Sequence, residues 1–102
     1  MICVIATIEV ADGRRSDFLA EFHKIVPLVL DEEGCIEYGP TIDVPTNIGL
    51  QPPARENVVV VLEKWASIEA LERHLIAPHM VEYRKQVKEM VVGTLLQVLE
   101  PA

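Results

Sequence analysis

The stretch VVVVLEKWASIEALERHLIAPHM, residues 58–80, opens as a strand and closes as a helix. Val58–Leu62 is a continuous aliphatic run, which is typical of a strand that is buried on both faces. Trp65 ends this strand, and Ser67 is placed to cap a helix that follows. Pro78 interrupts the helical pattern, so a second helix is expected to begin there. One tryptophan and two histidines therefore lie within a short strand-to-helix unit, and this unit is where we expect a site.

The remaining segments complete a β-α-β-β-α-β order. Alternating or helical spacing of apolar residues predicts strands at 2–10, 35–44 and 94–100, and helices at 16–32 and 78–91. This order predicts an α+β fold of the ferredoxin-like, split βαβ type, with helices on one face of an antiparallel sheet. The absence of an internal repeat or a linker predicts a single domain over residues 1–102.

Composition narrows the class of protein. The formal charge of −7 argues against nucleic acid or an anionic membrane as partner. We expect neither a secretory signal nor a membrane span. Cys3 and Cys35 are too few for a disulfide framework and are expected to be buried in strands, so a cytoplasmic location is expected.

The predicted sheet leaves one apolar face without a cover. A strand that is apolar on both sides exposes hydrophobic surface if the chain stays alone, and such surfaces are usually covered by a partner. We therefore expect a homodimer that buries sheet against sheet around a two-fold axis. Residues 45–56 form a long connection rich in Pro and Gly, and Ile48 and Leu50 within it indicate contact with a neighbouring surface.

No nucleotide loop, zinc cluster or nucleophile elbow is present in the sequence. His74 and His79 are the candidate catalytic residues, although they are five residues apart rather than the four that place two histidines on one helical face. The candidate substrate-binding side chains are aromatic or charged residues near the predicted pocket: Trp65, Tyr83, Glu63, Tyr38 and Arg84.

Five segments resemble the antibiotic biosynthesis monooxygenase superfamily, and most closely its small bacterial quinol monooxygenases. They are KIVP (24–27), EEGC (32–35), EKW (63–65), LIAPHM (75–80) and LEP (99–101). The resemblance implies a dimeric α/β barrel in which each subunit encloses a pocket between sheet and helices. It also implies oxidation of a quinol, or a similar electron-rich aromatic, by molecular oxygen without flavin, haem or metal.

A quinol can supply its own electrons to oxygen once it is deprotonated, so the protein needs an apolar pocket and a base with a pKa near neutral. Histidine is the natural base, and we expect His79 or His74 to take the proton while Trp65 and Tyr83 hold the ring.

Two other functions remain open at this stage. The same fold carries many unrelated tasks, so a non-catalytic small-molecule-binding or stress-response module is one alternative. The other is an isomerase or lyase that acts on a small cyclic acid, with histidine moving the proton.

Overall fold

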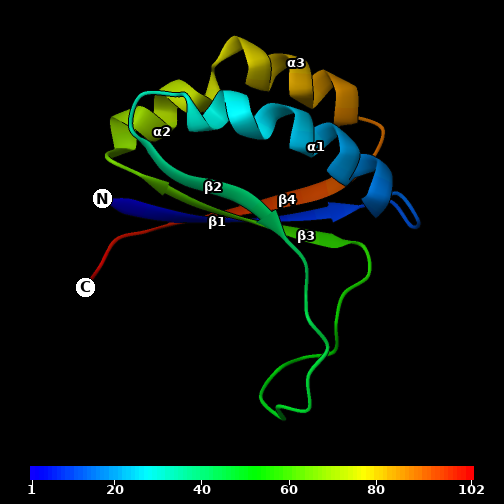
Figure 1. The fold of residues 1–102 in the computed structure, drawn as a ribbon. Coiled ribbons are helices and arrows are strands. Elements are labelled where there is room, and N and C mark those ends of the chain that lie inside the picture. Colours follow the sequence, from blue (N-terminus) through cyan, green and yellow to red (C-terminus); the bar gives the residue numbers. More distant parts are fainter.

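The computed structural model describes residues 1–102 as one four-stranded antiparallel sheet with three helices (Figure 1). The elements in chain order are β1 (Ile2–Val10), α1 (Arg15–Leu30), β2 (Cys35–Thr41), β3 (Val58–Trp65), α2 (Ile68–Leu75), α3 (Pro78–Val87) and β4 (Val91–Leu99). The strand order in the sheet is β2-β3-β1-β4, which confirms the predicted α+β, ferredoxin-like class. None of the helices is long and apolar enough to cross a membrane.

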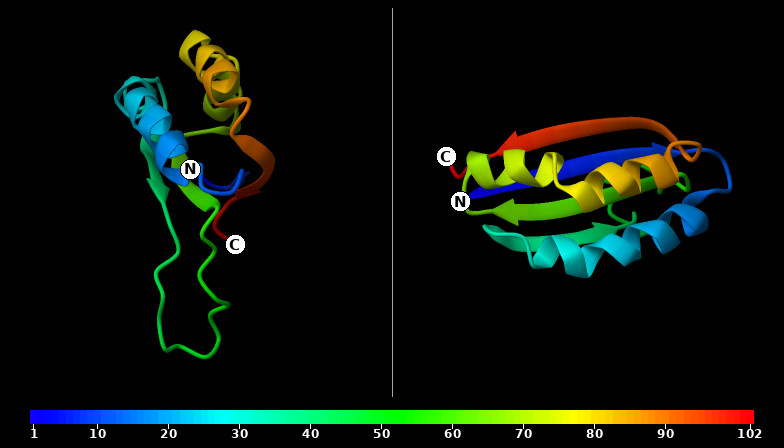
Figure 2. Two further views of the ribbon diagram at one scale, coloured as in Figure 1. Left: turned by 90° about the vertical axis from the view of Figure 1, so that its right-hand side faces the viewer. Right: turned by 90° about the horizontal axis from the view of Figure 1, so that it is seen from above.

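All three helices lie on one face of the sheet (Figures 1 and 2). The even-numbered residues of β1 point toward them and are buried, whereas the odd-numbered residues point to the other face. Phe18, Phe22, Ile25 and Val29 form the buried stripe of α1, as their helical spacing predicts.

One expectation about β3 is wrong, because the face of the sheet opposite the helices is open to solvent. The side chains of β3 are not all buried on both faces, because Leu62 is 43% exposed and pairs with Ile5, an odd-numbered residue of β1. β3 ends at Trp65, as predicted. Glu63 is polar, but it faces the helices and is buried there, so its polarity does not end the strand.

Several boundaries also differ from those predicted. α3 ends at Val87 and β4 already begins at Val91, because Val91 and Val92 are β-branched and Val91 pairs with Val10. Gly93 therefore lies inside a strand and does not end a helix. Cys3 and Cys35 lie in strands as expected, but both are only half-buried free thiols.

Residues 42–57 form an arm that extends from the ends of β2 and β3, on the side opposite the helices (Figure 1). The Arg55 guanidinium donates to both carboxylate oxygens of Asp43, at 2.8 and 3.0 Å, and ties the two sides of the arm together. Arg55 thereby lowers the pKa of Asp43 to about 2. Leu50 is 97% exposed within this chain, so its predicted contact with a neighbour stays a prediction.

Candidate active site

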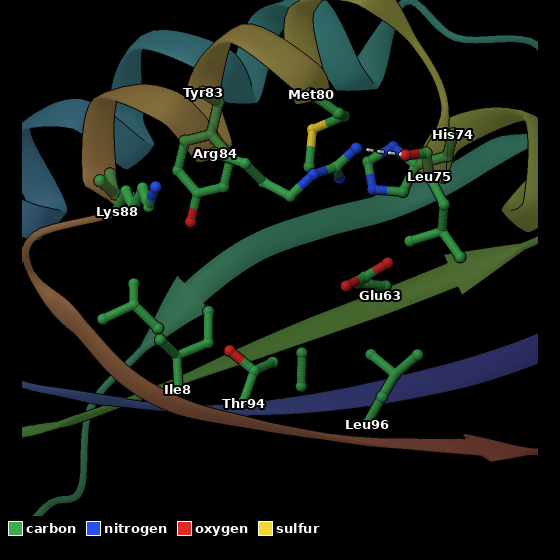
Figure 3. Close-up of a pocket in the computed structure, with 13 residues that line it drawn as sticks. Ile8, Glu63, His74, Leu75, Met80, Tyr83, Arg84, Lys88, Thr94 and Leu96 are labelled. Atoms are coloured by element: carbon green, nitrogen blue, oxygen red, sulfur yellow. Dashed lines mark hydrogen bonds between the residues drawn. The ribbon is translucent and has the colours of Figure 1, made fainter.

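A cavity of about 500 Å³ lies between the sheet and the helices α2 and α3 (Figure 3). It is open on the side of β4, because that edge strand has no helix above it (Figure 2). Apolar side chains make up most of its wall. The lining residues are Ala6, Ile8, Glu63, His74, Leu75, Met80, Tyr83, Arg84, Val87, Lys88, Val91, Thr94 and Leu96.

Several polar groups in the wall have an atom free to meet a ligand, and Glu63, His74 and Tyr83 are the ones near its centre. Glu63 uses Oε1 to accept a hydrogen bond from Trp65 Nε1 at 2.9 Å, and His74 uses Nδ1 to contact Glu32. No side-chain nitrogen or oxygen that is fully buried lacks a hydrogen-bond partner. Glu63 Oε2, His74 Nε2 and the Tyr83 hydroxyl have no protein partner, so these atoms open onto the cavity.

Burial changes the acidity of these groups. Desolvation raises the pKa of Glu63 to about 7, with a further rise from the nearby Glu32 charge and an opposing effect of the Trp65 hydrogen bond. Burial likewise raises the pKa of Tyr83, so its hydroxyl keeps its proton near neutral pH. A carboxyl group that exchanges its proton near pH 7 and a phenol that stays protonated therefore face the same space.

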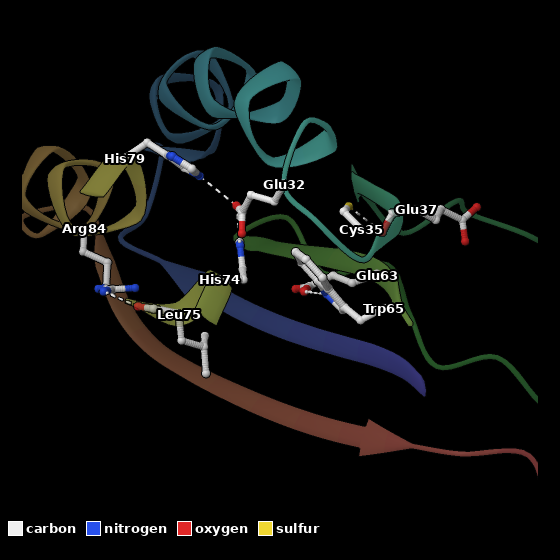
Figure 4. A network of polar contacts seen from close by, with 9 residues as sticks. All are labelled: Glu32, Cys35, Glu37, Glu63, Trp65, His74, Leu75, His79 and Arg84. Atoms are coloured by element: carbon white, nitrogen blue, oxygen red, sulfur yellow. Dashed lines mark hydrogen bonds and ion pairs between the residues drawn. The ribbon is translucent and has the colours of Figure 1, made fainter. Parts of the chain in front are cut away.

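Glu32 joins the two histidines (Figure 4). Its Oε2 atom lies 2.9 Å from His74 Nδ1 and 2.7 Å from His79 Nε2. Glu32 lies in the turn after α1, His74 in the last turn of α2 and His79 in the first turn of α3. The break at Pro78 separates the two helices, so histidines five residues apart can approach one carboxylate from two directions.

His74 is held as a neutral base. Its burial lowers its pKa, while the hydrogen bond and charge of Glu32 oppose that effect. A carboxylate oxygen can only accept, so Nδ1 carries the proton and Nε2 keeps its lone pair toward the cavity. This arrangement provides a proton acceptor whose protonated form is stabilised from behind by Glu32.

Trp65 and Tyr38 do not line the cavity. The Trp65 ring packs on His74 with centroids 4.6 Å apart, and Tyr38 meets the same imidazole edge-on at 5.4 Å. Both are almost fully buried, because α1 and α2 cover their end of the sheet. They fix the orientation of His74, whereas the sequence hypothesis placed Trp65 directly against the substrate.

Tyr83 and Arg84 do line the cavity, and His79 does not. Arg84 donates from Nη2 to the Leu75 carbonyl at 2.7 Å, which holds its guanidinium beside His74 (Figure 3). His79 instead borders a smaller hollow of about 200 Å³ between α1 and α3. Of the two candidate histidines, only His74 can touch a molecule in the cavity.

Glu32 was not among the predicted site residues. In the sequence it is one of three consecutive acidic residues before Gly34, a pattern that equally describes a solvated turn. Its partners are 42 and 47 residues away, so no local spacing connects them. No group of three or more His, Cys, Asp or Glu side chains is arranged to hold a metal ion.

Comparison with known proteins agrees with this architecture. The family model for antibiotic biosynthesis monooxygenase matches residues 1–86. The Escherichia coli (strain K12) protein named probable quinol monooxygenase YgiN is 41% identical over 103 residues, covering 99% of this chain and 98% of that protein.

Two solved structures have the same fold. PA3566 from Pseudomonas aeruginosa superposes with a TM-score of 0.81 at 22% identity, covering 99% of this chain and 93% of that one. Rv0793 from Mycobacterium tuberculosis gives a TM-score of 0.77 at 26% identity, covering 99% and 94%. The family match and the 41% identity over almost the full length lead to one conclusion: the chain belongs to the antibiotic biosynthesis monooxygenase family.

Proposed function

We propose that this protein is a cofactor-independent monooxygenase that oxidises a quinol, or a similar electron-rich aromatic, with molecular oxygen. The observation that carries the proposal is the free Nε2 of a neutral His74, which faces a largely apolar cavity and is backed by Glu32. The identity to the E. coli protein named as a probable quinol monooxygenase supports the substrate class.

The cavity suits an aromatic ring. Its volume of about 500 Å³ lies within the usual range for small-molecule sites, about 300–1,000 Å³. Ile8, Met80 and Leu96 supply apolar walls on opposite sides, while the Tyr83 hydroxyl is available to hydrogen-bond a ring oxygen. A bicyclic diol would bury its carbon skeleton and present one hydroxyl to His74.

The chemical step begins with proton removal. His74 Nε2 takes the hydroxyl proton and becomes an imidazolium, which Glu32 stabilises through Nδ1. The quinolate then transfers electrons to oxygen, and the Arg84 guanidinium beside His74 stabilises the anion. Overall, the diol and oxygen form a hydroxyquinone and water: one oxygen atom enters a ring C–H bond, and the other leaves as water with the two hydroxyl hydrogens.

Glu63 supplies a proton to the reduced oxygen, and it regains one when the His74 imidazolium releases the proton taken from the substrate. Because its pKa is raised to about 7 by burial, a fraction of it is protonated at neutral pH and can donate to the reduced oxygen. Glu63 and His74 would thus act as donor and acceptor on the same substrate. Trp65 and Tyr38 hold the imidazole in place, and His79 holds Glu32 from the other side.

Oxygen consumption tests this proposal. Metal-free protein supplied with reduced 2-methyl-1,4-naphthoquinone should consume oxygen faster than the quinol autoxidises. His74→Ala should reduce kcat by about 10²-fold or more, the usual contribution of a general base. The exposed His23 provides the matched control, and His23→Ala should leave the rate unchanged. Uptake no faster than autoxidation, both with this quinol and with 1,4-dihydroxy-2-naphthoate, would end the proposal.

We also propose that the functional form is a homodimer in the cytoplasm. Leu62, Leu95 and Leu99 are exposed and pair with odd-numbered residues of β1, so they share the face that no helix covers. A second copy stacked on this face would remove that apolar surface from water. The two cysteines are free thiols, as is usual in the cytoplasm.

A further inference from the structure

Two cations border the cavity of an acidic protein. The chain has 16 Asp and Glu against 9 Lys and Arg, yet the cavity wall contains Arg84 and Lys88 and only one acidic residue, Glu63. An excess of positive groups at this one place runs against the charge of the whole molecule. Such a local reversal is expected where a negatively charged molecule has to be held.

Neither cation is neutralised by the protein. No ion pair in the structure includes Arg84 or Lys88. Arg84 donates one Nη2 hydrogen to the Leu75 carbonyl, and its other N–H groups remain available as donors. Lys88 makes no side-chain hydrogen bond. Burial favours the uncharged forms of Glu63 and His74, so the cavity carries a net positive charge.

Their position at the C-terminal end of α3 places both cations at the cavity. Arg84 lies in the last turn of α3 and Lys88 is the residue that caps this helix, so the two are one turn apart on the same side (Figure 3). Lys85, on the same helix, does not line the cavity. The cationic rim is thus a feature of one side of α3, and Lys85 offers a matched control.

We propose that the preferred substrate is an anionic aromatic diol, whose ring carries a carboxylate or a similar acidic group that Lys88, together with Arg84, binds at the mouth of the cavity. This inference rests on the proposed function for the reaction itself. The apolar wall accepts the rings, and the rim accepts the acidic group by charge-assisted hydrogen bonds. Arg84 and Lys88 are exposed, so a neutral diol would leave them hydrated and would lack these charge-assisted bonds.

Competing substrates test the inference. Oxygen uptake is measured with 1,4-dihydroxy-2-naphthoate and with the neutral 2-methyl-1,4-dihydroxynaphthalene, and the ratio of their kcat/KM values is compared among variants. Lys88→Gln should lower the ratio of carboxylate to neutral diol by about tenfold, the lower end for hydrogen bonds to charged groups. Lys88→Arg should restore most of the ratio, and Lys85→Gln should leave it unchanged.

Binding without turnover keeps the inference separate from the proposed function. The only tryptophan, Trp65, packs on His74, so its fluorescence can report on ligands in the cavity. The unreactive 1-hydroxy-2-naphthoate should bind more tightly than 1-naphthol, and added salt should weaken only the former.

The possible results distinguish failure of this inference from failure of the proposed function. If the neutral diol is turned over but the carboxylate is not preferred, or if Lys88→Gln changes both substrates equally, the inference is wrong and the proposed function stands. If neither diol consumes oxygen, the proposed function fails. In that case, tighter and Lys88-dependent binding of the carboxylate would still support an anionic ligand, and equal binding would overturn it.

Discussion

Replacing Glu32 by Gln removes the charge that two histidines share while keeping the size of the side chain. Glu32 Oε2 lies 2.9 Å from His74 Nδ1 and 2.7 Å from His79 Nε2, and its side chain is only 14% exposed. The amide oxygen of Glu32→Gln can still accept one hydrogen bond, so the fold should survive with weaker contacts. The charge that stabilises the His74 imidazolium would be lost.

The expected loss in rate follows from the 2.9 Å distance between Glu32 and His74. An opposite charge this close raises the pKa of a cationic group by about 1 to 3. If half of this effect is expressed in the transition state for proton transfer, the loss of Glu32 slows the reaction by about 3- to 30-fold. The free energy of unfolding should fall by about 1.5–3 kcal/mol, since a hydrogen bond to a charged group is lost.

The pH dependence of oxygen uptake provides the assay. Activity requires neutral His74, and without Glu32 its pKa falls further below the usual value. The acidic limb of kcat/KM should therefore move to lower pH in Glu32→Gln while the plateau drops. Glu33→Gln is the matched control, because Glu33 is exposed and makes no side-chain contact of this kind. A full plateau, or a lowered plateau with an unmoved acidic limb, would refute the role given to Glu32.

Three other perturbations have definite expected results. Gly34 has φ +85°, and a Cβ added there would lie 2.6 Å from the Cβ of Ala70, whereas Gly13 has φ +76° and open space around it. Gly34→Ala should therefore lower Tm more than Gly13→Ala, because the clash costs about 1–3 kcal/mol of stability in addition to the backbone strain. Equal decreases in Tm for the two variants would argue against the clash. The pKa of Glu63 is raised from 4.5 to about 7, so the folded state binds the extra proton and stability should decline by about 2–3 kcal/mol between pH 4.5 and 7. In urea unfolding, the change in stability from pH 4.5 to 7 should therefore be more negative in the native protein than in Glu63→Gln by this amount, because the lowered pKa of His74 acts in the opposite direction in both proteins. Leu95 is 65% exposed on the open face, so Leu95→Asp should convert the proposed dimer to monomer in light scattering; a native protein that is already monomeric would contradict the dimer.

The order of elements could be predicted because side-chain periodicity is local. The even-numbered residues of β1 and the stripe of α1 were recognisable from spacing alone, and Ser67 does cap α2 by accepting from the Ala70 amide at 3.2 Å. The start of β4 was predicted at residue 94, three residues too late, because Gly93 belongs to a residue type that commonly follows the end of a helix. Pairing with β1 keeps Gly93 in a strand, and pairing is a long-range property.

The site was predicted only in outline. The segment 58–80, where the sequence predicted a site, contributes Glu63 and His74 to the cavity wall, whereas Trp65 packs on His74 and lies outside the wall. The sequence also left His74 and His79 equivalent as candidate bases. Only their positions around the cavity distinguish them, because His74 lines it and His79 does not.

By itself, the sequence determined the strands and helices, their order and the family resemblance, because these depend on residues that are neighbours along the chain. Tertiary structure alone decided that Glu32 meets two histidines 42 and 47 residues away, and that Arg84 and Lys88 border an apolar cavity. The physical reason is that hydrogen bonds and burial depend on distance in space. Folding brings the turn after α1 against the start of α3, and no periodicity in the chain records that contact.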